Sequence, residues 1–264
     1  MSMNNNNEQV HGEGEIINNR RVLSNKRDLK IRSQPDWKPM ALDHERPVKR
    51  PRTEPSILGS LAVGLKNQTH AVLVTLEEAN SDSLSYGMKK ILPIDKHVGM
   101  ATSGVTADAS TISQDMRREC LHYQLSRRSK IPVTRLIDSI TSKMNACARQ
   151  DTKRPYGIGS LVAGYDDQGP HLFETCPSAG CSDGRAMATG AESRGARTYL
   201  EKHLDEFTSC EVEDLVRHGL RSARDTLPSE VYLSTKNISI GIVGKDTDFK
   251  ILDDAETQRY LVEV

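Results

Sequence analysis

The stretch from Arg154 to Pro177 constrains the fold of this 264-residue chain more than any other segment. Its first run, 156–165, combines apolar residues with three glycines, and its second run, 172–176, ends just before the proline. The four residues between them, DDQG at 166–169, suit a tight turn, because aspartate tolerates and glycine readily adopts the required backbone angles. Many small residues in a strand are typical of a place where another sheet or backbone lies close. The sequence therefore predicts a β-hairpin in the middle of a sandwich.

Apolar runs of strand length predict further strands on both sides of this hairpin. They are 61–65, 70–76, 90–94 and 98–103 before it, and 185–190, 237–243 and 249–252 after it. The first two runs are joined by KNQT at 66–69, which has the composition of a hairpin turn. The polar, serine-rich stretch 77–87 is predicted to be a loop.

Four helices are predicted in two pairs, each with apolar residues at helical spacing. The apolar residues of the first helix are Ala109, Ile112, Met116 and Cys120, and those of the second are Val133, Leu136, Ile137, Ile140 and Met144. Those of the third are Tyr199, Leu200, Leu204 and Phe207. The fourth helix spans 211–227, and its apolar residues are Val212, Leu215, Val216, Leu220 and Ala223. Thr106 or Asp108 can cap the first helix, Pro132 suits the first turn of the second, and Ser193 caps the third. Pro228 ends the fourth helix, and the last residues of the chain form a short helix or fray.

Strands joined by hairpins, with helices arriving in pairs, argue against a parallel sheet built from βαβ units. They predict an α+β fold in which two antiparallel sheets lie face to face, each covered by one helix pair. This is a four-layer αββα sandwich, and it is expected to occupy residues 57–264. Residues 1–56 are rich in Asn, Arg, Lys and Pro with a single aromatic residue, Trp37, so this tail is predicted to be disordered. Its basic run RPVKRPR, Arg46–Arg52, is either a nuclear-import signal or part of a solvated tail.

The composition argues against several classes of function. The 36 basic and 36 acidic residues balance, so the net charge gives no reason to expect nucleic acid or membrane as a partner. No apolar run approaches the roughly 18 residues of a membrane span, and the N-terminus lacks the apolar core of a secretory signal. The five cysteines contain no C-x-x-C pair, which suggests reduced thiols in the cytosol or nucleus. Cys176 and Cys181 lack the further ligands of a zinc site, so neither a metal nor a cofactor is expected.

Four segments resemble the α-type subunits of the proteasome core particle. They are GVTADA (104–109), RPYGIGSLVAGYDDQGP (154–170), GARTYLE (195–201) and KNISIGIVGKD (236–246), and the similarity runs from about residue 59 to the mid-250s. The resemblance implies the αββα fold of the N-terminal-nucleophile (Ntn) hydrolases. It also implies a non-catalytic subunit of a seven-membered α ring, which stacks on rings of β subunits that hydrolyse peptides. Ubiquitin-dependent protein degradation in the cytoplasm and nucleus is the implied role.

One residue of this sequence argues against catalysis by the chain. Alignment with the active β subunits places Ser60 at the nucleophile, Leu76 at the carboxylate and Lys90 at the lysine. An N-terminal nucleophile needs its own amine as base and a nearby lysine and carboxylate for charge balance. Leucine cannot orient a lysine, and 59 residues precede Ser60, so the chain is not expected to be an enzyme. The alternative is a stand-alone Ntn hydrolase processed between Gly59 and Ser60.

Lys90 and Gly104 are the candidate binding residues. In the resembling family, a lysine and a glycine at these positions line pockets between neighbouring α subunits. The C-terminal carboxylates of activators and regulatory ATPases dock there through a charge-assisted contact. The alternative is that Lys90 is a solvated surface lysine beside Lys89.

The N-terminus departs from this family. Its members begin with a Tyr-Asp segment, a Ser-Pro turn and an amphipathic helix, and nothing in residues 1–56 matches them. An altered or misassigned first exon, a diverged paralogue with a free tail, and a tail with a separate nuclear role each explain the difference.

Overall fold

The computed structural model describes residues 59–77, 89–149, 154–178, 180–227 and 232–262. The tail expected at 1–56, its basic run Arg46–Arg52, and all but the first residue of the loop expected at 77–87 lie outside these segments. Within the described segments, no helix combines the length and apolarity needed to cross a membrane.

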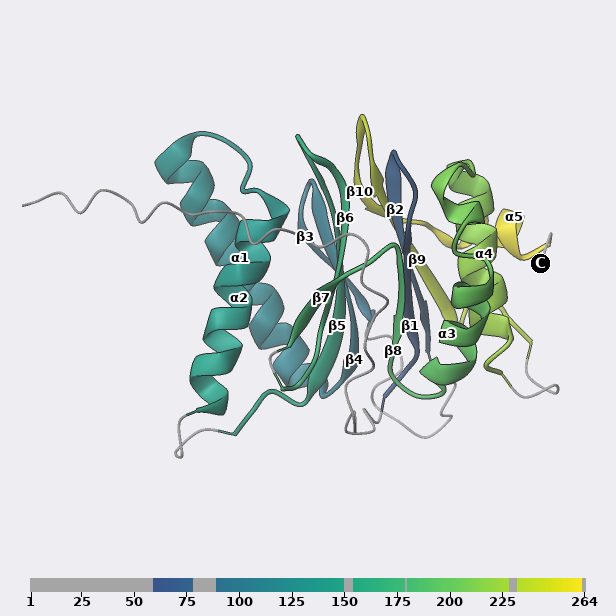
Figure 1. Cartoon of the computed structure of the whole chain (residues 1–264), viewed down its shortest axis with the longest axis horizontal. Helices are drawn as coiled ribbons and strands as arrows, with labels where there is room; N and C mark the ends of the chain where they lie inside the picture. Colours follow the sequence, from purple (N-terminus) through teal and green to yellow (C-terminus); the bar gives the residue numbers. More distant parts are fainter. Residues whose placement is uncertain (1–58, 78–88, 150–153, 179, 228–231, 263–264) are drawn as a thin grey trace, which may run out of the picture. The chain divides into compact units, whose positions relative to one another are not determined.

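Within the described residues, the strands form two five-stranded antiparallel sheets (Figure 1). The first sheet contains β1 (Ala62–Lys66), β2 (His70–Leu76), β8 (Ala186–Thr189), β9 (Ile238–Gly244) and β10 (Thr247–Ile251), in the order β10-β9-β2-β1-β8. The second contains β3 (Ile91–Asp95), β4 (Val98–Gly104), β5 (Ile158–Asp166), β6 (Gly169–Thr175) and β7 (Cys181–Asp183), in the order β3-β4-β5-β6-β7. The β5–β6 hairpin lies in the middle of the second sheet, as its small residues predict.

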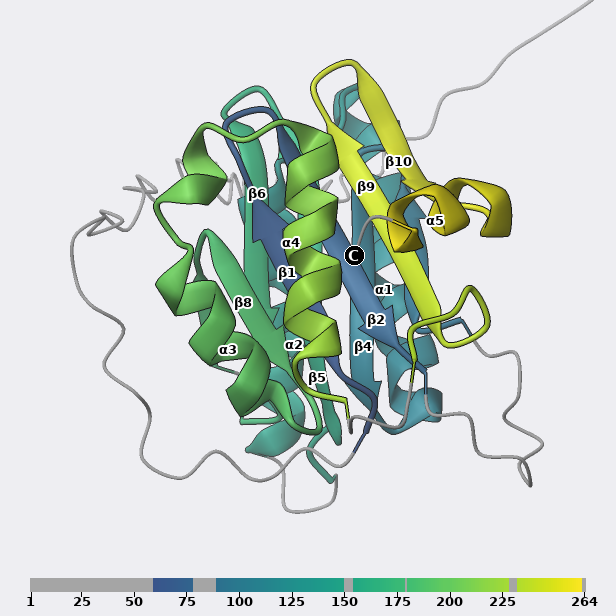
Figure 2. The ribbon, with the colours of Figure 1, turned by 90° about the vertical axis from the view of Figure 1, so that its right-hand side faces the viewer.

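Helices cover the outer face of each sheet. They are α1 (Thr106–Arg127) and α2 (Val133–Ala148) over the second sheet, and α3 (Ser193–Lys202) and α4 (Val212–Arg224) over the first, with α5 (Asp254–Leu261) beside α4. Figure 2 shows α3 and α4 lying across the first sheet, with α5 near β9 and β10. The predicted four-layer αββα sandwich is confirmed.

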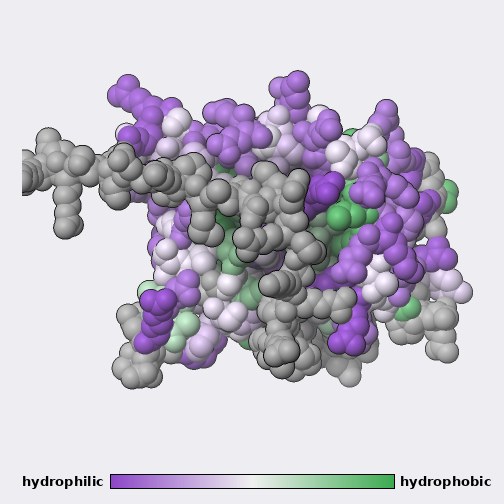
Figure 3. Space-filling model, viewed as in Figure 1, coloured by the Kyte–Doolittle hydropathy of each residue, from purple (hydrophilic) through white to green (hydrophobic). Residues whose placement is uncertain are grey.

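Apolar side chains fill three layers. Those between the first sheet and its helices include Val63, Val74, Leu200, Phe207 and Leu220, and those between the second sheet and its helices include Met100, Ile112, Met116, Leu136 and Val162. The layer between the sheets is smaller, and four of its residues are alanines at positions 62, 71, 101 and 163. Short side chains let the two sheets approach closely. Among the coloured residues in Figure 3, the helical sides are mostly hydrophilic, and apolar residues show mainly in strips between the layers.

The predicted helix caps are wrong. Neither α1 nor α3 has a side-chain cap, since Val105 and Glu192 occupy the capping positions and Ser193 is already inside α3. The N-terminus of α2 follows Pro132 as expected, but Asp166 satisfies it from 33 residues away by accepting a hydrogen bond from the Val133 amide at 3.0 Å.

Two further elements differ from the prediction, and of the two outcomes expected for the last residues, a short helix is the one that forms. The third helix does not reach Phe207: α3 ends at Lys202, and Phe207 is buried in a separate 3₁₀ turn, η1 (Glu206–Thr208). The last residues form α5, because Asp253 and Glu256 make a reciprocal capping box at its start. The strand β7 was not predicted, since its three residues lack an apolar alternation and are held by pairing with β6 at the sheet edge.

Candidate functional site

The turn from β4 into α1 contains Gly104, one of the two candidate docking residues. Its φ is +110°, a region that residues with a side chain rarely adopt. A Cβ built on Gly104 would lie only 2.4 Å from the carbonyl oxygen of Gly157. That same oxygen accepts a hydrogen bond from the Val105 amide at 3.1 Å. Both the backbone conformation and the close approach of Gly157 therefore require glycine at position 104.

Asp108 holds this turn against the segment that precedes β5. Its two carboxylate oxygens accept hydrogen bonds from Nη1 and Nη2 of Arg154, both at 2.7 Å, and Oδ2 also accepts from the Gly157 amide at 2.8 Å. Hydrogen bonding to Arg154 lowers the pKa of Asp108; burial opposes this shift and the Gly157 amide adds to it. Sequence reasoning interpreted Asp108 as a cap and missed Arg154, because a partner 46 residues away leaves no local pattern.

Lys90 lies at the same end of the second sheet as Gly104. It directly precedes β3, and its carbonyl oxygen accepts hydrogen bonds from the amide and hydroxyl of Thr102, at 3.0 and 3.2 Å. Thr102 stands two residues before Gly104 on β4. The structure therefore brings Lys90 and Gly104 together as neighbours of one strand end, with the Lys90 side chain half-buried.

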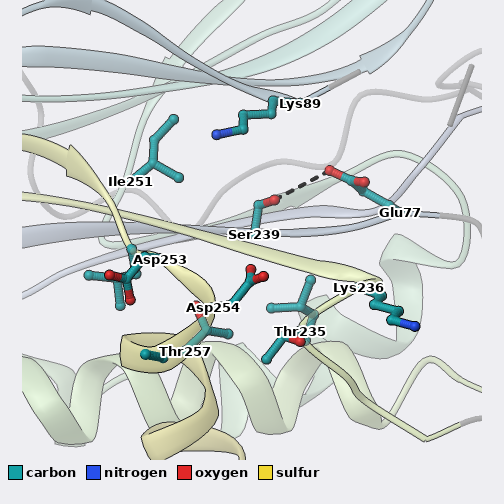
Figure 4. A pocket seen from close by; sticks show the side chains of 12 residues that line it. Glu77, Lys89, Thr235, Lys236, Ser239, Ile251, Asp253, Asp254 and Thr257 are labelled. Carbon is teal, nitrogen blue, oxygen red and sulfur yellow. Dashed lines mark hydrogen bonds between the residues drawn. The ribbon is translucent and has the colours of Figure 1, made fainter. Parts of the chain in front are cut away.

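A pocket of about 570 Å³ has Lys89, the residue before Lys90, in its lining (Figure 4). Its charged lining residues are Glu77, Lys89, Lys236, Asp253 and Asp254. Glu77 accepts a hydrogen bond from the Ser239 hydroxyl at 3.3 Å, and Lys89 extends across the pocket. Neither Lys90 nor Gly104 lines it. The pocket is therefore a separate feature, although Lys89 and Lys90 are adjacent in the chain.

Ser60 occupies the position aligned with a catalytic nucleophile. The residue aligned with the catalytic acid is Leu76, which carries no carboxylate. Ser60 is 8% exposed and Leu76 is 7% exposed. Leu76 packs in the apolar layer beneath α3 and α4, and its amide donates to the Leu61 carbonyl at 2.9 Å. The peptide bond before Ser60 is held by the structure: the Gly59 carbonyl accepts from the Ala191 amide at 2.9 Å. Leu76 therefore serves as a core residue here, which gives the hydrolase alternative no support.

Comparison with known proteins points to one family. A family model described as proteasome subunit matches residues 58–243. The chain is 45% identical over 204 residues to proteasome subunit alpha type-1 of Dictyostelium discoideum, which covers 77% of this chain and 82% of that protein.

Two further relatives are similar over an equal share of the chain. Proteasome subunit alpha type-1 of Drosophila melanogaster is 42% identical, covering 77% of this chain and 74% of that protein. Proteasome subunit alpha type-6 of Saccharomyces cerevisiae is 38% identical, covering 77% and 87%. Together with the αββα fold, these matches show that the chain belongs to the proteasome subunit family.

Proposed function

We propose that this chain is a non-catalytic, structural α-type subunit of the proteasome core particle and contributes to ubiquitin-dependent protein degradation. The relatives to which the chain is similar are named proteasome alpha subunits, and the similarity covers most of their length. The observation that most supports a non-enzymatic role is Leu76, which fills the aligned carboxylate position with a buried apolar side chain. Without an acid to orient a lysine, an N-terminal nucleophile lacks its charge balance.

Assembly with other proteasome subunits is the function of such a chain. The finer arrangement that we propose is a seven-membered α ring stacked on a ring of β subunits. One supporting feature is a pair of exposed apolar side chains on α1: Leu121 is 57% and Leu125 is 75% exposed. Residues four apart lie on the same helix face, so a neighbouring subunit would cover both at once.

The end of the second sheet is the proposed docking place for C-terminal carboxylates of activators and regulatory ATPases. The Lys90 ammonium would supply the charge-assisted contact. Gly104 would shape this end of the sheet, since its lack of a side chain lets the Gly157 carbonyl lie against β4. Support comes from their shared neighbour Thr102, through which the register places both residues at one strand end.

The proposal is tested by expressing the tagged full chain in cells and purifying it under native conditions. A ring subunit is expected to migrate with a particle many times its own mass, together with other α and β subunits and their peptidase activity. Fractionation is expected to recover this particle from both cytoplasm and nucleus. A chain that migrates at the mass of a single copy, with no other proteasome subunit, would refute the proposal.

A further inference from the structure

Two histidines and one carboxylate converge where α3 passes into α4. His203 is the residue that follows α3, Glu206 begins the η1 turn, and His218 lies in the middle of α4. Nδ1 of His203 lies 3.2 Å from both carboxylate oxygens of Glu206, and Nε2 of His218 lies 3.6 Å from Oε2. One donor atom from each residue can be chosen so that all three lie within 4.8 Å of one another.

We propose that His203, Glu206 and His218 form a binding site for a divalent transition-metal ion of the zinc class. Two imidazoles and one carboxylate are a donor set that zinc accepts, usually with a fourth position left for water. Donors at 2.0–2.1 Å from a tetrahedral ion stand about 3.3 Å apart. Two of the three pairs have separations of 3.2 and 3.6 Å, close to this value, and all three donors can be chosen within 4.8 Å of one another.

The surrounding rings orient the donors. The Tyr199 hydroxyl lies 3.0 Å from Nδ1 of His218, so Nδ1 can carry the ring proton and leave the lone pair of Nε2 directed at the ion. The Phe207 ring packs edge-on against His218 with centroids 5.1 Å apart, and Tyr199 lies 4.4 Å from His203. A partner on the other ring nitrogen is the usual arrangement around a metal-binding histidine, and it fixes both tautomer and orientation.

The three side chains differ in exposure, from His218 in the interior to Glu206 at the surface. The side chains of His218, His203 and Glu206 are 12%, 33% and 58% exposed. An ion can therefore enter from the Glu206 side and keep a water molecule there. Once bound, it would join the end of α3 to α4 over the first sheet.

This site has no recognisable spacing in the sequence, since its ligands are separated by two and then eleven residues. It arises because the η1 turn reverses the chain so that Glu206 faces back to α3 and across to α4. A metal that binds the folded chain and not the unfolded one raises the stability of the fold. The bound ion would therefore hold α3 and α4 together.

The test uses the purified full chain, freed of metal with a chelator and titrated with Zn²⁺ by calorimetry and with Co²⁺ by absorption. We expect one tight site, and His203→Gln and Glu206→Gln are each expected to weaken Zn²⁺ binding at least about tenfold. Tyr199→Phe, which removes only the hydroxyl near His218, is expected to weaken it about 10–100-fold. The matched control is His122→Gln, an exposed histidine outside the cluster, which should bind as the wild type does.

Two readouts separate this site from binding by the five cysteines or by histidines elsewhere. The Co²⁺ spectrum should show the visible bands of a four-coordinate nitrogen and oxygen site without thiolate charge-transfer absorption. Zn²⁺ should raise the melting temperature of the wild type and of His122→Gln, but not of His203→Gln. The proposal is overturned if wild type and His203→Gln, both folded by circular dichroism, bind Zn²⁺ equally, or if thiolate bands dominate the Co²⁺ spectrum.

Discussion

Asp108 and Arg154 form a bidentate ion pair, in which both nitrogen–oxygen distances are 2.7 Å. The pair joins the first turn of α1 to the segment that leads into β5, and the same carboxylate accepts the Gly157 amide. The Gly157 carbonyl in turn lies against Gly104. Asp108 therefore positions the backbone at the proposed docking end of the second sheet, although it is not part of the docking contact.

Removal of this carboxylate should destabilise the fold. Asp108 is 7% exposed, and Asp108→Ala leaves the Gly157 amide without its acceptor. We expect a loss of about 1–3 kcal/mol in the free energy of unfolding, because the half-buried Gly157 amide loses its acceptor and Arg154 loses its charge-assisted partner. Urea denaturation of the full chain measures it. Asp115→Ala is the control, because its partner Arg118 is 74% exposed and such surface pairs contribute about 0–1 kcal/mol. Equal losses in both variants would contradict the assigned role.

The pH dependence of stability should change in the same variant. The pKa of Asp108 is lower in the folded chain than its ordinary value of 3.8, chiefly because Arg154 hydrogen-bonds to it. A carboxyl group with a lowered folded pKa stabilises the protein above its unfolded pKa and loses this contribution as the pH falls through the folded value. Urea midpoints measured from pH 6 downward should therefore fall less steeply below about pH 4 in Asp108→Ala than in the wild type.

The fold was predictable from the sequence where its determinants are local. Alternating apolar residues and turn residues such as those at 166–169 specify the hairpins, and apolar spacing specifies α1, α2 and α4. The predictions for caps failed because long-range contacts replaced local ones: Asp108 binds Arg154, and Asp166 satisfies the start of α2. The edge strand β7 carries no apolar alternation, so only its pairing with β6 reveals it.

The candidate sites divide in the same way. Lys90 and Gly104 could be named from family resemblance, but their position at one strand end follows from the register of β3 against β4. Leu76 could be read directly as a missing acid. The convergence of His203 and His218 could not be predicted, because it depends on where α3 stops and how the η1 turn reverses the chain.

Charge reversal at Lys90 should weaken activator docking. Lys90→Glu replaces a charge-assisted contact, generally contributing about 1.5–3 kcal/mol, with repulsion of the incoming carboxylate. Assembled particles carrying it should bind activator C-terminal peptides roughly tenfold to a hundredfold more weakly. Lys89→Glu is a matched control with the same charge change one residue away, in the separate pocket. Fluorescence anisotropy with labelled peptides gives the affinities, and unchanged binding by Lys90→Glu would exclude the docking role.

Replacement of the aligned nucleophile should leave catalysis unchanged. Ser60→Ala removes the hydroxyl that the hydrolase alternative would use as its nucleophile. Because alanine is smaller than serine, it fits this buried site, where Ser60 is only 8% exposed. Particles containing Ser60→Ala are expected to hydrolyse fluorogenic peptides at the wild-type rate. N-terminal sequencing of the mature chain should not find Ser60 as the first residue. A drop in hydrolysis specific to this variant, or processing at Ser60, would revive the enzymatic alternative.

Substitution of Gly104 by alanine separates the two reasons for glycine there. Gly104 and Gly169 have nearly the same φ, +110° and +108°, so alanine at either position suffers a similar backbone strain of about 1–3 kcal/mol. Only at Gly104 would the new Cβ meet the Gly157 carbonyl oxygen, at 2.4 Å, whereas nothing lies within 4 Å at Gly169. Gly104→Ala should therefore lower the free energy of unfolding by more than Gly169→Ala, and the difference includes the cost of the steric contact. Because relief of the clash must push the Gly157 segment away from β4, Gly104→Ala should also weaken activator-peptide binding to assembled particles, which Gly169→Ala should leave intact. Equal destabilisation by both substitutions would mean that the β4–α1 turn yields to a methyl group, and that the close packing of Gly157 does not define this end of the sheet.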